Sequence, residues 1–273
     1  MDIRESAKGH ILIAAHRGCC GGNIPCNTLE AFQAAVDFGA DIVEIDIAPS
    51  VDKQLFVFHP GMEYPHLRTR KIIRALTSSA VKRLNYVNCD RVRTEYKIST
   101  LGEVLELLKG KCYINIDKFW TAIPEITAAV RYHGMQDQII VKTPAEEKYL
   151  DMVESYAPEL NYISMIRRKD EVTDEILKRN INYLGAEILF KSDEEDVVSD
   201  EYINSMHEKN LLIWANPIVY NCNDIIAADH TDDVAVCGDR ERGWLWYAKK
   251  GIDIVQTDWL LAMRQYYKSE NVL

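Results

Sequence analysis

Acidic residues at the ends of two apolar segments are the strongest chemical signal in this sequence. Glu44 and Asp46 lie two residues apart in the segment 42–47, so a β-strand would direct both to the same face. Asp117 ends the segment 112–117 with the same alternation. Burying such acids is costly unless a cation lies between them. A salt-bridged rim is one explanation, but three carboxylates at one sheet edge favour a divalent metal, Mg²⁺ or Ca²⁺.

Two histidines and an arginine could act beside that metal. His16, Arg17 and Gly18 directly follow the apolar segment 11–15, and His59 ends the apolar segment 55–58. An imidazole exchanges protons near neutral pH, and a guanidinium can bind a phosphate through two hydrogen bonds. Taken alone, each could equally be a surface or rim residue. Their role therefore depends on the elements that position them.

Those elements alternate regularly along the chain. Segments typical of strands occur eight times, at residues 11–15, 42–47, 112–117, 138–142, 162–165, 183–189, 211–215 and 252–257. Helical periodicity fills most of the intervals, which predicts parallel strands with right-handed crossovers. Eight such units predict an α/β fold of the (β/α)₈ TIM-barrel type. An open doubly wound sheet is the alternative, but no GxGxxG turn follows a strand.

An insertion interrupts this repeat after the second strand. Residues 49–58 read as a hairpin that leaves the barrel rim and returns to it at His59. Residues 60–99 are rich in arginine and lysine, with one weak helical piece at 78–84, and are long enough for a lid or small subdomain over the barrel mouth. We therefore predict one domain, residues 1–273, with an insertion at 60–99.

Composition narrows the class of protein. The chain has 273 residues, of which 47% are hydrophobic and 27% charged, a composition that argues against disorder. Its net charge of -10 argues against a nucleic-acid partner. Seven cysteines without a CxxC pair suggest neither a disulfide framework nor a zinc site. The apolar run near the N-terminus is too short for a membrane span, so a cytoplasmic protein is expected, unless an export signal was removed. Its oligomeric state is left open.

The order of these motifs resembles the glycerophosphodiester phosphodiesterase family. The resemblance rests on residues 16–18, 27–32, 39–46, 57–59, 99–105, 115–117, 214–216 and 251–258, and so spans nearly the whole chain. It implies a phosphodiesterase-type TIM barrel that uses a divalent cation to hydrolyse glycerophosphodiesters to glycerol phosphate and an alcohol. The expected partner is thus a small phosphodiester.

The resemblance also implies roles for individual residues. The metal ligands of the family fall on Glu44, Asp46 and Asp117. Its catalytic histidines fall on His16 and His59, and either could be the general acid. Its phosphate-binding arginine falls on Arg17.

Departures from the family pattern leave the activity open. Cys26 and Pro60 stand where the family usually has acids. Phe119 stands where the family has a lysine that points into the barrel, and strand alternation turns Lys118 away from the barrel interior. We therefore expect Lys142, at the end of the next strand, to supply the missing positive charge. A different phosphodiester, such as a lysophospholipid or a sugar phosphodiester, is one alternative substrate. A non-hydrolytic phosphoester-binding barrel is another possible outcome.

Four more polar or aromatic residues have competing interpretations. Glu187 could face the substrate or bridge Lys191, and Trp214 could stack on the substrate or fill the barrel. Asn27, with Glu30 three residues later, is expected to form a helix capping box. Asp258 is expected to cap the last helix.

Overall fold

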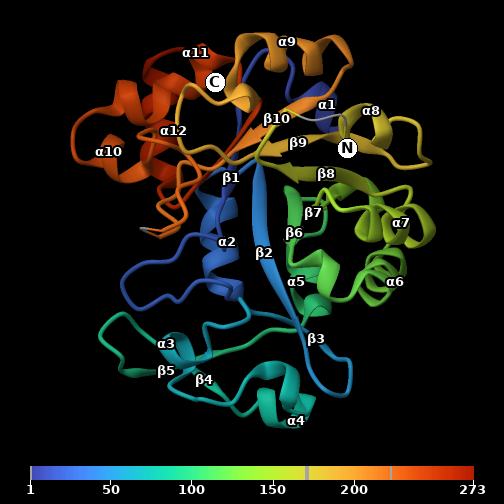
Figure 1. The fold of residues 1–273 in the computed structure, drawn as a ribbon. Helices are drawn as coiled ribbons and strands as arrows, with labels where there is room; N and C mark the ends of the chain where they lie inside the picture. The colour runs from blue at the N-terminus through green and yellow to red at the C-terminus, as the bar shows by residue number, and fades with distance from the viewer. Residues whose placement is uncertain (1, 170–171, 222) are drawn as a thin grey trace.

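Parallel strand pairing runs unbroken around the molecule. The computed structural model describes residues 2–169, 172–221 and 223–273. The ring consists of β1 (Leu12–Ala15), β2 (Ile42–Pro49), β6 (Tyr113–Asp117), β7 (Ile139–Pro144), β8 (Asn161–Ile166), β9 (Tyr183–Ile188), β10 (Leu212–Ala215) and β11 (Ile254–Thr257). Pairing of β1 with both β11 and β2 closes it. The predicted eight-stranded barrel is therefore confirmed (Figure 1).

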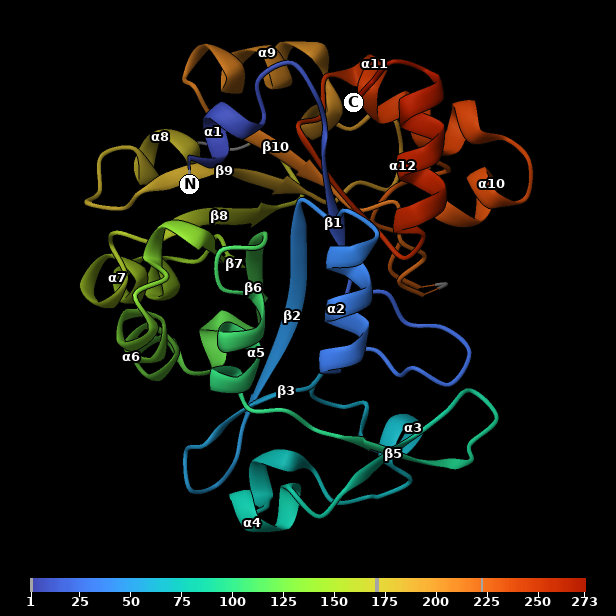
Figure 2. The same cartoon turned by 180° about the vertical axis from the view of Figure 1, so that it is seen from behind.

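Helices cover the outside of the barrel, as Figure 2 shows from behind. They are α2 (Leu29–Asp37), α5 (Leu101–Leu108), α6 (Ile123–His133), α7 (Glu147–Tyr156), α8 (Val172–Ile176), α9 (Asp200–Glu208), α10 (Asp232–Val236), α11 (Trp246–Lys250) and α12 (Leu260–Ser269). Their apolar faces pack on the outward side chains of the strands in the largest hydrophobic cluster. Burial of both strand faces explains the continuous apolar runs of the sequence.

A second, smaller cluster fills the barrel interior. It takes inward residues from all eight strands, including Leu12, Ile42 and Trp214. The short helix α1 (Ile3–Ser6) adds Ile3 to it and so closes the amino end. Toward the carboxyl ends the inward residues become polar, which places the functional site at that mouth.

The insertion is more structured than its sequence indicated. After β3 (Leu55–Val57), which pairs antiparallel with β2 as the predicted hairpin requires, come α3 (Glu63–Leu67), α4 (Ser78–Val81) and the hairpin of β4 (Asn85–Val87) and β5 (Arg93–Lys97). These elements gather beyond the carboxyl end of β2 (Figure 1). They have their own apolar cluster, which includes Phe58, Ile73 and Tyr86. Only the weak helix was predicted, because the other elements are too short to show periodicity.

The described residues include no helix that is both long and apolar enough to cross a membrane. Six cysteines lie within them, and all six are free thiols.

Candidate active site

Three carboxylates converge at the mouth of the barrel. Glu44 and Asp46 point inward from β2, and the register pairs Asp46 with Asp117 of β6. Each of the three offers an oxygen within 4.8 Å of the others, as the strand alternation predicted. Glu44 and Asp46 are buried, and the Asp46 Oδ1 atom has no hydrogen-bond partner among the described residues. Buried acids at this spacing, with an unpaired oxygen, fit a hard cation such as Mg²⁺ or Ca²⁺.

The electrostatics of the cluster agree with that fit. Burial, followed by repulsion from Asp46, raises the pKa of Glu44 to about 7. Burial acts in the same direction on Asp117, but Lys142 and Lys118 outweigh it and hold the pKa of Asp117 below its usual range. The mutual repulsion of the acids is thus only partly offset by protein cations. A bound divalent ion would relieve it.

Arg17 supports the cluster from the loop after β1. Its backbone N–H donates to the Glu44 Oε2 atom over 2.9 Å, and its guanidinium Nε lies 3.0 Å from the Asp46 Oδ2 atom. The loop can turn this closely because Gly18 has φ +79°, and a Cβ there would lie 2.7 Å from the backbone of Ala31. Arg17 therefore lies where it neutralises the acids and still lines the mouth.

Asn27 is a site residue that the sequence interpretation missed. The predicted capping box is wrong, because Thr28 is the N-cap of α2 and accepts from the Ala31 N–H. The Asn27 side chain is buried and donates from Nδ2 to the Asp46 Oδ2 atom over 2.9 Å. The signal available in the sequence was the residue type, because asparagine adopts a left-handed backbone more readily than most residues, and Asn27 has a φ of 58°.

His16 is oriented by Asp258. Its Nδ1 lies 2.8 Å from the Asp258 Oδ1 atom, which leaves Nε2 for the substrate. Burial disfavours the charged imidazole, but the hydrogen bond that His16 donates to Asp258 and the charge of Glu44 outweigh burial and raise the pKa of His16. The expected capping role of Asp258 is wrong, since α12 begins after Trp259 without a side-chain cap. A carboxylate behind an imidazole instead fixes its orientation and favours its charged form.

His59 lies beside the acids at the mouth. Its Nε2 lies 3.9 Å from the Asp46 Oδ1 atom. Burial lowers the pKa of His59, and the positive charges of Arg17 and Lys118 add to that effect while Asp46 opposes it. The two predicted histidines are therefore together at the mouth, one held toward its charged form and the other toward its neutral form.

Both lysines near Asp117 reach the site. Lys118 has φ 58°, which ends the alternation of β6 and turns its Nζ to 2.8 Å from the Asp117 Oδ2 atom. The expectation that Lys118 points away is therefore wrong. Phe119 also differs from the expectation, because it packs in the outer core between strands and helices. Lys142 is buried and projects inward.

Lys142 of β7 forms a buried polar group with Glu187 of β9 and with Asn216, which directly follows β10. Its Nζ lies 3.0 Å from the Glu187 Oε2 atom, and Asn216 donates from Nδ2 to Glu187 Oε1 over 2.5 Å. Glu187 thus lines the pocket and pairs with Lys142, so the expected bridge to Lys191 is wrong. Trp214 is fully buried in the barrel interior, 5.4 Å from the Lys142 Nζ, and its Nε1 donates to Asn216. Trp214 does not itself line the mouth pocket.

Side chains of the site surround one pocket of about 170 Å³ at the carboxyl ends of the strands. It combines the two histidines, Arg17, Asp117 and the Lys142–Glu187 pair with an apolar side that includes Leu189 and Ile226. Cations, a carboxylate cluster and two imidazoles in one pocket are the components needed to bind and cleave a phosphate ester. The predicted residues that line this pocket are His16, Arg17, His59, Asp117, Lys142 and Glu187, and Glu44 and Asp46 lie beneath it.

Comparison with protein families agrees with this chemistry. Residues 16–258 match the Glycerophosphoryl diester phosphodiesterase family. A glycerophosphodiester phosphodiesterase of Caldanaerobacter subterraneus subsp. tengcongensis is 27% identical over 140 residues, which are 48% of this chain and 57% of the relative. One from Bacillus altitudinis is 30% identical over 128 residues, 46% of this chain and 50% of the relative. The chain thus spans about half the length of the curated relatives it matches.

Solved structures show the same fold. A glycerophosphoryl diester phosphodiesterase from Parabacteroides distasonis superposes with a TM-score of 0.80 at 16% identity, over 99% of this chain and 93% of that chain. A phosphodiesterase from Oleispira antarctica, in complex with the product sn-glycerol-3-phosphate, superposes with a TM-score of 0.70 at 17% identity, over 95% and 97% of the two chains. At these identities the likeness concerns the fold alone.

Proposed function

Because the chain belongs to the glycerophosphoryl diester phosphodiesterase family, we propose that it hydrolyses a glycerophosphodiester to glycerol phosphate and an alcohol. The observation that carries this proposal is the meeting of the acid cluster with His16, His59 and Arg17 at the mouth of the barrel. The product bound to the Oleispira antarctica phosphodiesterase supports the choice of glycerol phosphate.

The metal-binding role falls on Glu44, Asp46 and Asp117. A divalent ion bound there would polarise a phosphoryl oxygen and orient the attacking hydroxyl. Arg17 and Asn27 hold the acids in place through Glu44 and Asp46. Metal binding would leave the Arg17 guanidinium available to the anionic phosphate, which it can contact through two N–H groups.

The two histidines divide the proton transfers. His59, held toward its neutral form, accepts the proton of the attacking hydroxyl as a bond forms between its oxygen and phosphorus. His16, held toward its charged form by Asp258, donates a proton to the departing alkoxide as the second phosphorus–oxygen bond breaks. The pair thus begins with one proton and ends with one, now on His59. Because the attacking hydroxyl belongs to the glycerol, this first step yields a cyclic phosphate of glycerol. Water then attacks the same phosphorus and gives its proton to His16, while His59 returns its proton to the glycerol oxygen as the ring opens, which releases glycerol phosphate and restores both histidines.

The buried polar group around Lys142 serves the glycerol half of the substrate. Lys142, Glu187 and Asn216 offer both donors and acceptors at the inner wall of the pocket, which suits hydroxyl groups. Lys142 also faces Asp117 and so adds positive charge near the phosphate. Trp214 supports this group from below through its hydrogen bond to Asn216.

Hydrolysis is tested by incubating the protein with glycerophosphocholine and related diesters, with added Mg²⁺ or Ca²⁺ and with EDTA. We expect metal-dependent release of glycerol phosphate. His16→Ala and His59→Ala should each lower kcat by about 10²-fold or more, because each removes a proton-transfer group. His10→Ala, which alters an exposed histidine outside the pocket, is the matched control. If only lysophospholipids or sugar phosphodiesters are hydrolysed, the proposed substrate is wrong. If the diesters bind but are not hydrolysed, the proposed reaction is wrong.

A further inference from the structure

The insertion has a charge opposite to that of the rest of the chain. Residues 60–99 contain nine arginines and lysines against three acidic residues, although the whole chain carries a net charge of -10. One of the three acids, Glu63, is buried and accepts a hydrogen bond from the Ile73 N–H. The insertion therefore presents a strongly basic surface beside the mouth of an acidic barrel.

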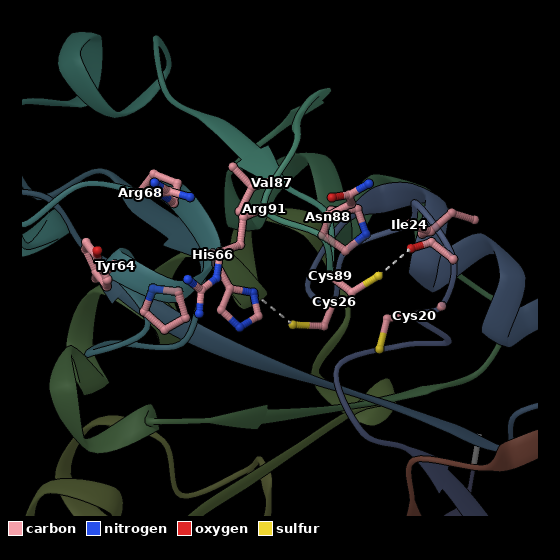
Figure 3. A pocket seen from close by; sticks show the side chains of 14 residues that line it. Cys20, Ile24, Cys26, Tyr64, His66, Arg68, Val87, Asn88, Cys89 and Arg91 are labelled. Atoms are coloured by element: carbon pink, nitrogen blue, oxygen red, sulfur yellow. Dashed lines mark hydrogen bonds between the residues drawn. The ribbon is translucent and has the colours of Figure 1, made fainter.

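A hollow of about 440 Å³ lies between this insertion and the loop that follows Arg17. Residues 20–22 and 24–26 line it together with residues of α3 and of the β4–β5 turn (Figure 3). Arg68 and Arg91 are its charged residues, and no acidic side chain is among the described residues that line it. Its field is therefore positive without any balancing acid, whereas the mouth pocket is lined by acidic and basic side chains together.

The hollow lies close to the catalytic pocket, because Cys26 and His66 of the hollow and His59 of the pocket line one narrow gap. At its inner end the Cys26 Sγ lies 3.7 Å from the His66 Nδ1 (Figure 3). Cys26 precedes Asn27, which holds the acid cluster, and the His66 ring packs 6.4 Å from that of Phe58, which precedes His59. A diester centred on Arg17 and His59 could thus extend one arm into the barrel and the other into the hollow.

The positive surface continues outward from there. A second hollow of about 440 Å³ shares Arg68 and Arg91 with the first and adds Arg83 and Arg93. Within the part of the chain that the structure describes, Arg68, Arg83 and Arg91 make no ion pair and no side-chain hydrogen bond. Arg93 donates to the Asn85 side chain. Arginines in a concave surface without acidic partners are suited to phosphate or carboxylate ligands.

We infer that the Arg68–Arg91 hollow binds the leaving alcohol of the substrate, and that this alcohol carries a further phosphate or other anionic group. The inference rests on the proposed hydrolysis and names its substrate class. A cationic head group such as choline finds no acidic partner among the described residues of this hollow and is repelled by its arginines.

The test compares two diesters that differ by one phosphate, glycerophosphoinositol and glycerophosphoinositol 4-phosphate, with Mg²⁺ present. We expect kcat/KM to be at least about tenfold higher for the phosphorylated diester, since two guanidinium contacts are gained. Arg68→Asn/Arg91→Asn should bring this ratio close to one. Asparagine is chosen because both positions have a left-handed backbone, with φ of 55° and 62°. The control Arg70→Gln/Arg74→Gln removes the same charge from exposed arginines that line neither hollow and should keep the ratio.

A wild-type ratio within about twofold of one would overturn the inference, because the guanidinium contacts would then contribute no binding energy. The inference would also be overturned if the kcat/KM ratio of the two diesters stayed high in Arg68→Asn/Arg91→Asn, or if it fell equally in the Arg70→Gln/Arg74→Gln control. If neither diester is cleaved, the proposed hydrolysis fails, and binding of inositol 4-phosphate measured by calorimetry tests the hollow separately. We then expect the Kd to rise at least about tenfold in the Arg68/Arg91 variant alone. Equal Kd values would refute the anion site.

Discussion

Mg²⁺ should stabilise this protein, and its effect should grow with pH. The cluster of Glu44, Asp46 and Asp117 exists only in the folded chain, so an ion that binds there stabilises the fold by mass action. At an Mg²⁺ concentration about one hundred times the Kd, the gain is about 2.7 kcal/mol. For a chain of 273 residues this raises the Tm by about 5 °C.

The pH dependence follows from Glu44. Its pKa is raised to about 7 from an ordinary value of 4.5, so the folded state without metal favours the proton. Stability without metal should therefore fall as the pH rises from 4.5 toward 7, by about 3 kcal/mol at most. The metal needs the ionised Glu44 carboxylate, for which protons compete. This competition weakens metal binding roughly tenfold more at about pH 6 than at about pH 8, a difference of about 1.4 kcal/mol in binding free energy. The Tm gain from Mg²⁺ should be correspondingly larger at the higher pH.

Thermal unfolding followed by fluorescence at these two pH values, with Mg²⁺ and with EDTA, measures both effects. Asp46→Asn should abolish the Tm gain, because it removes a charged ligand. Glu30→Gln, which neutralises an exposed acid on α2, should keep it. No gain in the wild type at millimolar Mg²⁺ and the higher pH, or an equal gain in Asp46→Asn, would refute the metal assignment. A gain that shrinks with rising pH would refute the role of Glu44.

Three further perturbations test the surroundings of the site. Asp258→Asn should lower kcat by roughly 10- to 100-fold with little change in KM and shift the alkaline limb of the rate profile to lower pH, because His16 loses the carboxylate that favours its protonated form. An unchanged profile would contradict that role. Lys142→Met should cost about 3 kcal/mol or more in urea unfolding, since Glu187 is left buried without its cation, and adding Glu187→Gln should restore part of the loss. A loss below about 1 kcal/mol would show that this pair is not important to stability. Gly185→Ala should lower the Tm strongly, because a Cβ there would lie 1.9 Å from a carbonyl oxygen of β10; a Tm within about 2 °C of wild type would show that the strand can shift.

Alternation along single strands was enough to predict much of the barrel and of its acidic site. Glu44 and Asp46 share a face with each other, and Asp117 and Lys142 lie at the carboxyl ends of the next two strands of the ring. Period-two geometry and the parallel register decide these placements, and both can be read from the chain. Alternation failed where a strand ended, at Lys118, because one residue with positive φ reverses the direction of the next side chain.

Local patterns were misleading for residues whose partners are distant in the chain. Asn27 and Asp258 each precede a helix, and a polar residue there is usually a cap. In the structure Asn27 bonds Asp46, and Asp258 bonds His16 from 242 positions away. Sequence gives the donors and acceptors of a side chain but not which competing partner lies within reach.

The sequence by itself therefore determined the barrel, the acid cluster and the pair of histidines, because each depends on short-range periodicity and on the order of the strands. Only the tertiary structure decided how the site is supported and what lies beside it. Arg68 and Arg91 are scattered basic residues in the sequence, with nothing to distinguish them from seven others in the insertion. Folding of the insertion against the loop after Arg17 brings these two together in one hollow, because concave surfaces arise from packing between segments and not from the order of residues within them.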